Sequence, residues 1–156
     1  MKVIGSFRLT VLALTLSVFL APGSRCFASI TYDWRAAEHK VPGDLCDTAD
    51  RDFDGFRYQE KIPHCKRNVT VETKRAVAHD FGIFDGYEKY EIDHYIPLSI
   101  GGSNEPANLW PLPVPVARAK SDLEGKIHQQ VIAGELSQDQ AIERVRSWKK
   151  FLQLEE

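Results

Sequence analysis

The sequence lacks an excess of basic residues, internal repeats and low-complexity tracts. Its 20 Lys and Arg face 22 Asp and Glu, for a formal net charge of −2. A strongly basic protein that coats nucleic acid is therefore excluded. Collagen-like, coiled-coil and disordered chains are excluded too, because 43% hydrophobic and 10% aromatic residues can build a core. At 156 residues the chain suits one globular domain and is too short for two sizeable ones.

The apolar stretch near the N-terminus is too short for a membrane-spanning helix, which takes roughly 20 residues. It covers 13 residues, Leu9–Ala21, after the basic Lys2 and Arg8. A basic start, a short apolar run and a small-residue end predict a secretory signal peptide over residues 1–28, cleaved after Ala28. We therefore expect a periplasmic or secreted protein with no stable membrane association after cleavage.

Two alternatives stay open for this segment. One is a lipid anchor on Cys26, which the preceding Arg25 disfavours, and the other is a buried N-terminal helix. Cleavage would remove three basic and no acidic residues, leaving 17 basic against 22 acidic residues and a net charge of −5. Phosphate binding by the mature chain would then need a local basic patch or a metal.

Cysteine is scarce, with three in the chain, of which Cys26 lies in the expected signal peptide. The other two, Cys46 and Cys65, favour one disulfide in an oxidising compartment. Such a bond would close a loop of about 20 residues and stabilise the fold by roughly 3 kcal/mol. Two free thiols remain an alternative, whereas a zinc site is disfavoured because neither cysteine has a near neighbour at ligand spacing.

Residues 29–66 are predicted to be irregular, because prolines and glycines interrupt them. Periodicity, caps and turn residues predict the later elements. These are a helix over 70–81, a strand over 87–94, a return strand over 108–110 that prolines break, a helix over 116–133 and a helix from Ser137. Trp110 is expected in the core, between the hairpin and a helix.

The most specific pattern is the stretch Glu91–Trp110, EIDHYIPLSIGGSNEPANLW. An Asp-His pair, then Ile-Pro-Leu, a Gly-Gly turn and an Asn-Leu pair 14 residues after the His resemble the HNH (His-Asn-His, ββα-metal) endonuclease family, in particular its small bacterial members. The resemblance covers roughly residues 62–152. It implies an α+β fold with a ββα-metal hairpin-plus-helix core and flanking helices, in a nuclease domain over 67–156.

The resemblance implies a metal-dependent endonuclease, a hydrolase of nucleic-acid phosphodiester bonds. It makes His94 the general base, and an imidazole pKa near neutrality suits proton transfer from water. It places Asp93 on one divalent metal that contacts the scissile phosphate. Asn108 would hold the hairpin loop together and help to orient the base. Adjacent strand residues face opposite sides, however, so Asp93 and His94 act together only if the strand ends or bulges there.

The third position departs from the family pattern, in which a helical His commonly binds the metal. The equivalent helix offers Glu124 and His128, which lie on one face at i, i+4 spacing, with Asp122 as a substitute. We expect them to complete the metal site, although an ordinary solvated pair remains an alternative. Oxygen-rich ligation favours Mg²⁺, with Mn²⁺ or Zn²⁺ as alternatives.

Lys120, Arg118 and Arg67 are the candidate nucleic-acid-binding residues, although surface solubility explains each of them equally well. The expected partner is nucleic acid, DNA in preference to RNA. A second hypothesis is a non-catalytic exported binding module that kept the HNH scaffold and lost its chemistry. His94 would then be a structural histidine.

Overall fold

The computed structural model describes residues 32–152, which fall within one compact unit. The expected signal peptide at residues 1–28 lies outside the described residues. Of the helices between residues 32 and 152, none is long and apolar enough to cross a membrane.

The helices after residue 66 form where the sequence pattern predicts them, whereas α1 lies in the region predicted to be irregular. The described residues contain α1 (Trp34–Ala37), α2 (Val71–Asp80), α3 (Val114–Ile132), α4 (Gln138–Arg146) and α5 (Trp148–Phe151). The Thr70 side chain caps α2 by accepting a hydrogen bond from the Thr73 N–H. Ser137 and Gln140 form a capping box at the start of α4. The helices expected over 70–81 and 116–133 are therefore confirmed, with small shifts at their ends. The helix expected from Ser137 is present but is divided at Ser147 into α4 and α5.

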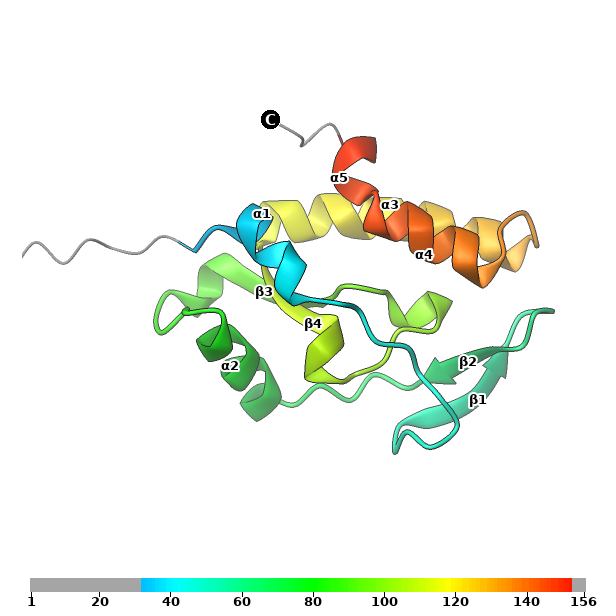
Figure 1. Ribbon diagram of the computed structural model, residues 1–156, viewed down its shortest axis with the longest axis horizontal. Coiled ribbons are helices and arrows are strands. Elements are labelled where there is room, and N and C mark those ends of the chain that lie inside the picture. The colour runs from blue at the N-terminus through cyan, green and yellow to red at the C-terminus, as the bar shows by residue number, and fades with distance from the viewer. Residues whose placement is uncertain (1–31, 153–156) are drawn as a thin grey trace, which may run out of the picture. The chain divides into compact units, whose positions relative to one another are not determined.

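A two-stranded antiparallel hairpin precedes α3. It pairs β3 (Tyr90–His94) with β4 (Leu109–Pro113), so that Asp93 faces Trp110 and His94 faces Leu109. The expected strand over 87–94 begins later, because residues 87–89 form a 3-10 turn. The order along the chain is strand, long loop, strand, helix, and Figure 1 shows α3 lying along the hairpin.

The expectation that prolines end the return strand after Trp110 is wrong, since β4 continues through Pro111 and Pro113. The register explains this tolerance. The Tyr95 N–H donates to the Asn108 carbonyl, and alternation from that pair puts both prolines at non-hydrogen-bonded positions. The pairing with β3 therefore requires no backbone N–H donor at either proline.

The N-terminal region is more ordered than the sequence predicts. It contains an antiparallel hairpin of β1 (Phe53–Arg57) and β2 (Ile62–Cys65). The turn between them has positive φ at Tyr58 and Lys61, 61° and 57°, and contains no Gly or Asn. Turn chemistry that usually marks a hairpin is thus missing from the sequence. The predicted disulfide is present, with the Cα atoms of Cys46 and Cys65 5.6 Å apart.

A cluster of tryptophans forms the centre of the core. Trp110 and Trp148 are fully buried and Trp34 nearly so. Their rings pack at centroid distances of 5.4 Å (Trp34–Trp148), 6.2 Å (Trp110–Trp148) and 6.5 Å (Trp34–Trp110). The prediction of a core role for Trp110 is confirmed. The cluster ties α1, the hairpin and α5 together, and so fixes the strand that leads into α3.

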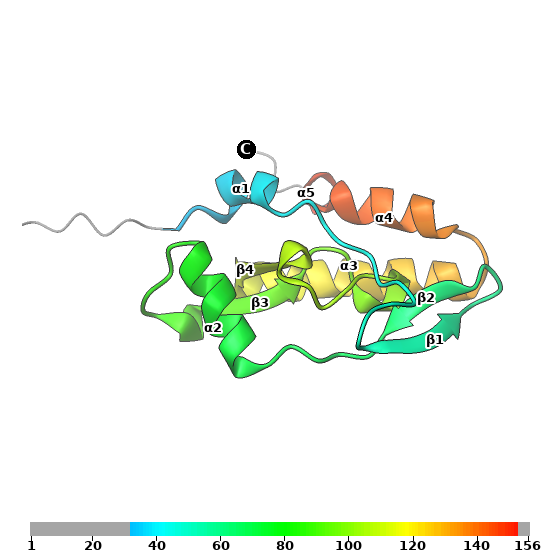
Figure 2. The same ribbon diagram turned by 60° about the horizontal axis from the view of Figure 1, so that its bottom comes forward.

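The long loop between β3 and β4, residues 95–108, is held by the N-terminal region. The Cys46 N–H donates to the Gly101 carbonyl at 2.9 Å. The Ser103 N–H donates to the Asp44 carbonyl at 3.0 Å, and the Ser103 hydroxyl to the Asp44 carboxylate at 2.8 Å. Figures 1 and 2 show the β1–β2 hairpin and α2 toward opposite ends of the β3–β4 hairpin. The described part of residues 29–66 therefore packs with the rest of the fold and is not a separate domain.

Candidate functional site

Two neighbouring residues at the end of β3 send their side chains to different partners. The Asp93 carboxylate pairs with Lys120 of α3. The His94 ring contacts Asn104 of the loop instead. This divergence follows from strand alternation, because β3 has no bulge in its pairing with β4. The expected joint action of Asp93 and His94 on one metal therefore gains no support from their placement.

Lys120 is a fully buried cation. Its ammonium donates to Asp93 Oδ2 and to the His94 carbonyl, both at 2.8 Å, and also to Glu124 Oε1. Burial disfavours the charged ammonium, but the carboxylates of Asp93 and Glu124 outweigh burial and raise the pKa of Lys120. We call Asp93, Lys120 and Glu124 the ion cluster. Lys120 and Glu124 lie one turn apart on α3, which puts them on the same face.

Glu124 is the member of the ion cluster whose charged form is disfavoured by its surroundings. Burial raises its pKa to about 7, against the lowering effect of Lys120, and Asp93 adds to the rise. Two carboxylates beside one ammonium leave a surplus of negative charge in a place that water hardly reaches. Lys120 is thus what allows two acidic side chains to lie together at the base of the hairpin.

His94 is 2% exposed. Burial lowers its pKa, and the hydrogen bond to Asn104 offsets this only in part. The ring is therefore neutral at pH 7 and has one basic nitrogen. Nε2 lies 3.1 Å from Asn104 Oδ1, whereas Nδ1 is buried and has no hydrogen-bond partner within residues 32–152. A buried polar atom of this kind costs free energy unless a water or ligand satisfies it.

Asn108 is fully buried and holds the loop closed. Its Oδ1 accepts from the Ile96 N–H at 2.8 Å, and its Nδ2 donates to the carbonyls of Ile96 and Ser103, both at 2.9 Å. Gly102 packs against the Ile96 backbone, and a Cβ at this position would lie 1.9 Å from the Ile96 carbonyl oxygen, so a larger residue does not fit. These contacts match the loop-holding role expected for Asn108 and give it no contact with the His94 ring.

The residues expected to hold a divalent metal do not assemble a metal site. Glu124 and Asp93 come together, but the Lys120 ammonium lies between their carboxylates. His128 packs against the ring of Tyr58 at 5.9 Å, and Asp122 is exposed. Within residues 32–152, the only three potential ligands that converge are Cys46, Asp50 and Cys65.

Those three do not fit a metal either, because both sulfurs are consumed in the disulfide. Within the described residues, then, neither set offers three free donor atoms to one ion. A Mg²⁺ ion at the carboxylates of Asp93 and Glu124 would have to displace the Lys120 ammonium, and we assign no chemical step to a metal.

The candidate phosphate contacts differ in their surroundings. Lys120 is unsuited to this role, because its ammonium is buried and already donates to three acceptors. Arg118 and Arg67 are exposed. Besides burial, the positive charge of Arg67 lowers the pKa of both His94 and Glu124. Of the two exposed candidates, Arg67 is therefore the one whose charge acts on His94.

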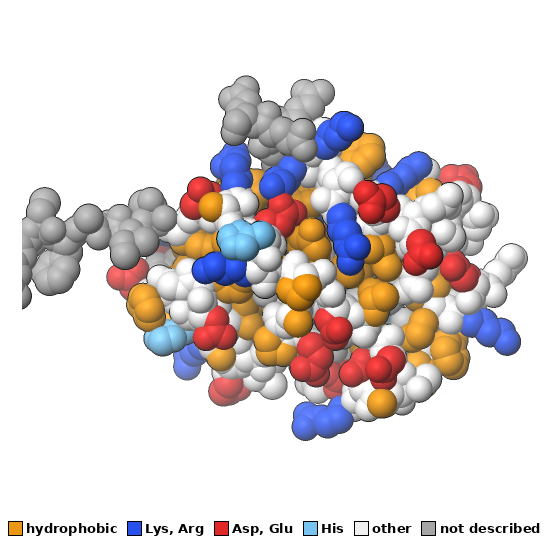
Figure 3. Space-filling model, viewed as in Figure 1, with side chains coloured by type: hydrophobic (Ala, Val, Ile, Leu, Met, Phe, Trp, Pro, Cys, Tyr) orange, Lys and Arg blue, Asp and Glu red, His pale blue; other side chains and the backbone are white. Residues whose placement is uncertain are grey.

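The molecule shows no broad basic surface on the face seen in Figure 3. Acidic and basic side chains are interspersed there, and several acidic ones lie together in the lower half of the view. This distribution agrees with the slightly negative net charge. Nucleic-acid binding on this face would depend on a few local contacts.

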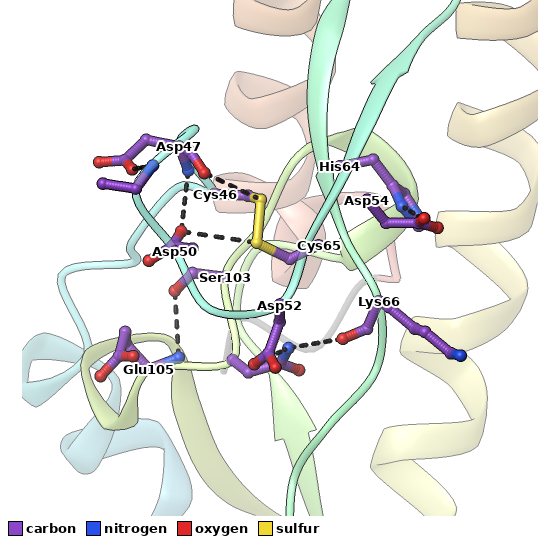
Figure 4. The surroundings of a disulfide bond; sticks show 12 residues. Cys46, Asp47, Asp50, Asp52, Asp54, His64, Cys65, Lys66, Ser103 and Glu105 are labelled. Carbon is purple, nitrogen blue, oxygen red and sulfur yellow. Dashed lines mark hydrogen bonds and ion pairs between the residues drawn. A yellow bond between two sulfur atoms is a disulfide. The ribbon is translucent and has the colours of Figure 1, made fainter.

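Asn104, Asp52 and Asn68 are site residues that sequence reasoning missed. Asn104 Nδ2 donates to Asp52 Oδ2 at 3.1 Å and to the Lys66 carbonyl at 2.8 Å. Asp52 Oδ1 accepts from Asn68 Nδ2 at 2.7 Å. Figure 4 shows Asp52 and Lys66 beside the disulfide. Asn104 could have been noticed as the last residue of the Gly-Gly-Ser-Asn turn, whereas Asp52 is hidden among neighbouring aspartates.

Comparisons of the chain with protein-family models, with curated proteins and with solved structures gave no match in any of the three. The strand–loop–strand–helix order and the placement of His94, Asn104 and Asn108 are therefore the basis for any functional argument.

Proposed function

We propose that the chain is an HNH-like nuclease that hydrolyses phosphodiester bonds of nucleic acid, DNA in preference to RNA. One observation supports this above all. His94 at the end of β3 is a neutral, buried imidazole with one nitrogen held by Asn104 and the other without a partner among residues 32–152. A histidine in this state is suited to general-base catalysis, because it is oriented and has a free lone pair.

In the proposed reaction, the unpartnered nitrogen of His94 takes a proton from a water molecule. The water oxygen bonds to phosphorus, the bond from phosphorus to the leaving oxygen breaks, and that oxygen takes a proton from solvent. The exposed guanidinium of Arg67 pairs with the non-bridging oxygens and offsets their charge. Lys120 supports the step indirectly, since it neutralises carboxylates that would otherwise repel the phosphate.

Export to the periplasm or the medium is part of the same proposal. It rests on the sequence of residues 1–28 and on the disulfide, which suits an oxidising compartment. A disulfide-stabilised nuclease in such a compartment would meet nucleic acid outside the cytoplasm.

Nicking of supercoiled plasmid by the purified, oxidised protein tests the proposal, with single-stranded DNA and RNA as further substrates. Each substrate is incubated with Mg²⁺, Mn²⁺ or Zn²⁺ and with EDTA. We expect His94→Ala to lose about 10²–10⁴-fold in rate, as for loss of a general base. The matched control is His79→Ala, because His79 is exposed on α2 and has no assigned role. Equal rates for His94→Ala and wild type would refute the assignment of the base.

The non-catalytic binding module remains the second candidate, and the ion cluster favours it. A buried ammonium between the two carboxylates stabilises them without a metal, as a scaffold that had lost its chemistry would require. This candidate predicts no cleavage of any of the three substrates with any of the ions. It also predicts that nucleic-acid binding, measured by fluorescence anisotropy, is unchanged in His94→Ala.

A further inference from the structure

The amide group of Asn104 has one possible orientation. Its nitrogen lies 3.1 Å from Asp52 Oδ2 and 2.8 Å from the Lys66 carbonyl, both of which only accept hydrogen bonds. Its oxygen accepts from the Asn68 N–H at 3.3 Å. A flipped amide would set its oxygen against two acceptors and its nitrogen against a donor. The orientation of Asn104 therefore follows from the hydrogen-bond network.

The orientation of Asn104 decides which His94 nitrogen carries the proton. The Asn104 oxygen lies 3.1 Å from His94 Nε2 and can only accept, so Nε2 must donate. A neutral imidazole has one N–H, and Nδ1 is left with the lone pair. Nδ1 is also the nitrogen without a partner in the described part of the chain.

We propose that Asn104, held by Asp52 and Lys66, is a positioning residue that fixes His94 as its Nε2–H tautomer and so leaves the buried Nδ1 as the basic nitrogen of the ring. The donation from Nε2 to Asn104 stands on geometry alone, and the absence of a proton on Nδ1 follows from the neutral, buried ring. Only their catalytic consequence rests on the proposed nuclease function.

The support for Asn104 comes from the N-terminal region. Asp52 also accepts from Asn68 Nδ2 through its other oxygen, and its carbonyl accepts from the Lys66 N–H at 2.8 Å. Lys66 follows Cys65, whose disulfide to Cys46 ties this segment to the loop before β1, as Figure 4 shows. A chain of contacts thus runs from the disulfide-bonded segment through Asn104 to the His94 ring. In the Ser-His-Asp triad the acid orients the base directly, whereas here Asp52 acts on His94 through Asn104.

Nitrogen-15 NMR of the wild-type imidazole is the first test. We expect His94 Nε2 to be protonated, with an N–H that exchanges slowly with solvent, and Nδ1 to be unprotonated. Asn104→Leu removes the acceptor, so the Nε2–H signal should exchange much faster. A wild-type His94 protonated on Nδ1, or an Nε2–H equally protected in Asn104→Leu, would overturn the proposal.

Activity provides the second measurement. We expect Asn104→Leu and Asp52→Ala to lower kcat about 10- to 100-fold, a typical loss for an outer residue that orients a reactive one. KM should change little, because neither residue is assigned a contact with substrate. The control is Asp54→Ala, which removes a carboxylate that pairs with Arg57 and His64 on the β1–β2 hairpin and is not a partner of Asn104. Circular dichroism shows whether each variant folds, and Asp52→Ala serves if Asn104→Leu does not.

The two proposals fail in different ways. If wild type cleaves no substrate while the Nε2–H is protected and this protection is lost in Asn104→Leu, the nuclease proposal fails and the positioning role stands. If wild type cleaves and folded Asn104→Leu cleaves at the same rate, the positioning role is overturned and the nuclease proposal stands.

Discussion

Replacement of Lys120 by methionine removes the only ammonium of the ion cluster and keeps an unbranched side chain of similar length. In the wild type this ammonium has three acceptors, the carboxylates of Asp93 and Glu124 and the His94 carbonyl. In the variant the two carboxylates face each other without a cation, and the carbonyl loses its donor. Packing of the side-chain stem is preserved, so the change isolates the charge.

Removing one partner of a buried ion pair costs about 3–5 kcal/mol. We expect the lower end, because Glu124 already has a raised pKa and can take up a proton when Lys120 is absent. At roughly 3–5 °C per kcal/mol for a domain of this size, Tm should fall by roughly 10–15 °C.

The assay is thermal unfolding followed by circular dichroism at pH 7 in EDTA, checked by urea titration. Lys126→Met is the control, since Lys126 is an exposed lysine on the same helix and should change stability by less than about 0.5 kcal/mol. Adding Glu124→Gln to Lys120→Met removes the like-charge pair and should recover part of the loss. A Tm for Lys120→Met within 2 °C of wild type, roughly 0.5 kcal/mol by the same conversion, would refute the reasoning.

The same variant tests the metal site. With Lys120 replaced, the two carboxylates are free to bind a hard cation, so Mn²⁺ should raise Tm more in Lys120→Met than in wild type. An equal or larger rise in wild type would contradict this expectation.

Two further predictions concern the loop that carries the site. Asn108→Ala removes three hydrogen bonds inside the loop and leaves buried partners unsatisfied, so urea unfolding should show a loss of about 2–4 kcal/mol; a loss under 1 kcal/mol would contradict this role. Replacing Cys46 and Cys65 together by serine should cost about 3 kcal/mol by the loop-entropy estimate and also speed exchange of the His94 Nε2–H. Unchanged exchange in the folded double variant would separate the disulfide from the network around Asn104.

The sequence predicts those parts of the fold that depend on local pattern. Helical periodicity places α2, α3 and α4, because each helix buries one face. Side-chain caps mark the starts of α2 and α4, whereas α3 begins after Pro113 without a side-chain cap. The Asp-His to Asn-Leu spacing locates the β3–β4 hairpin. The extent of β4 was not predicted, because tolerance of proline depends on the strand register. The β1–β2 hairpin was not predicted, because its turn lacks the usual turn residues.

The candidate site was harder to predict, because its decisive contacts join distant parts of the chain. Asp52 and Asn104 are 52 residues apart, and no local pattern relates them. Lys120 was expected at the surface, where most lysines lie, although its i, i+4 spacing to Glu124 already signalled a pair. The sequence does not show that the Asp93 carboxylate of β3 lies next to α3, where it pairs with the Lys120 ammonium and stabilises it in the interior.

The placement of residues 43–68 shows why the hairpin and helix do not define the site by themselves. The β3–β4 hairpin and α3 supply His94, Asn108 and Lys120, but His94 is oriented by a loop residue whose own partners lie before α2. A two-stranded hairpin has little stability of its own, and its loop conformation depends on what packs against it. The disulfide-bonded segment holds this loop from outside. The state of His94 is therefore a property of the whole described unit, and any activity of this site should be lost when the N-terminal segment is released, even if the hairpin and helix stay folded.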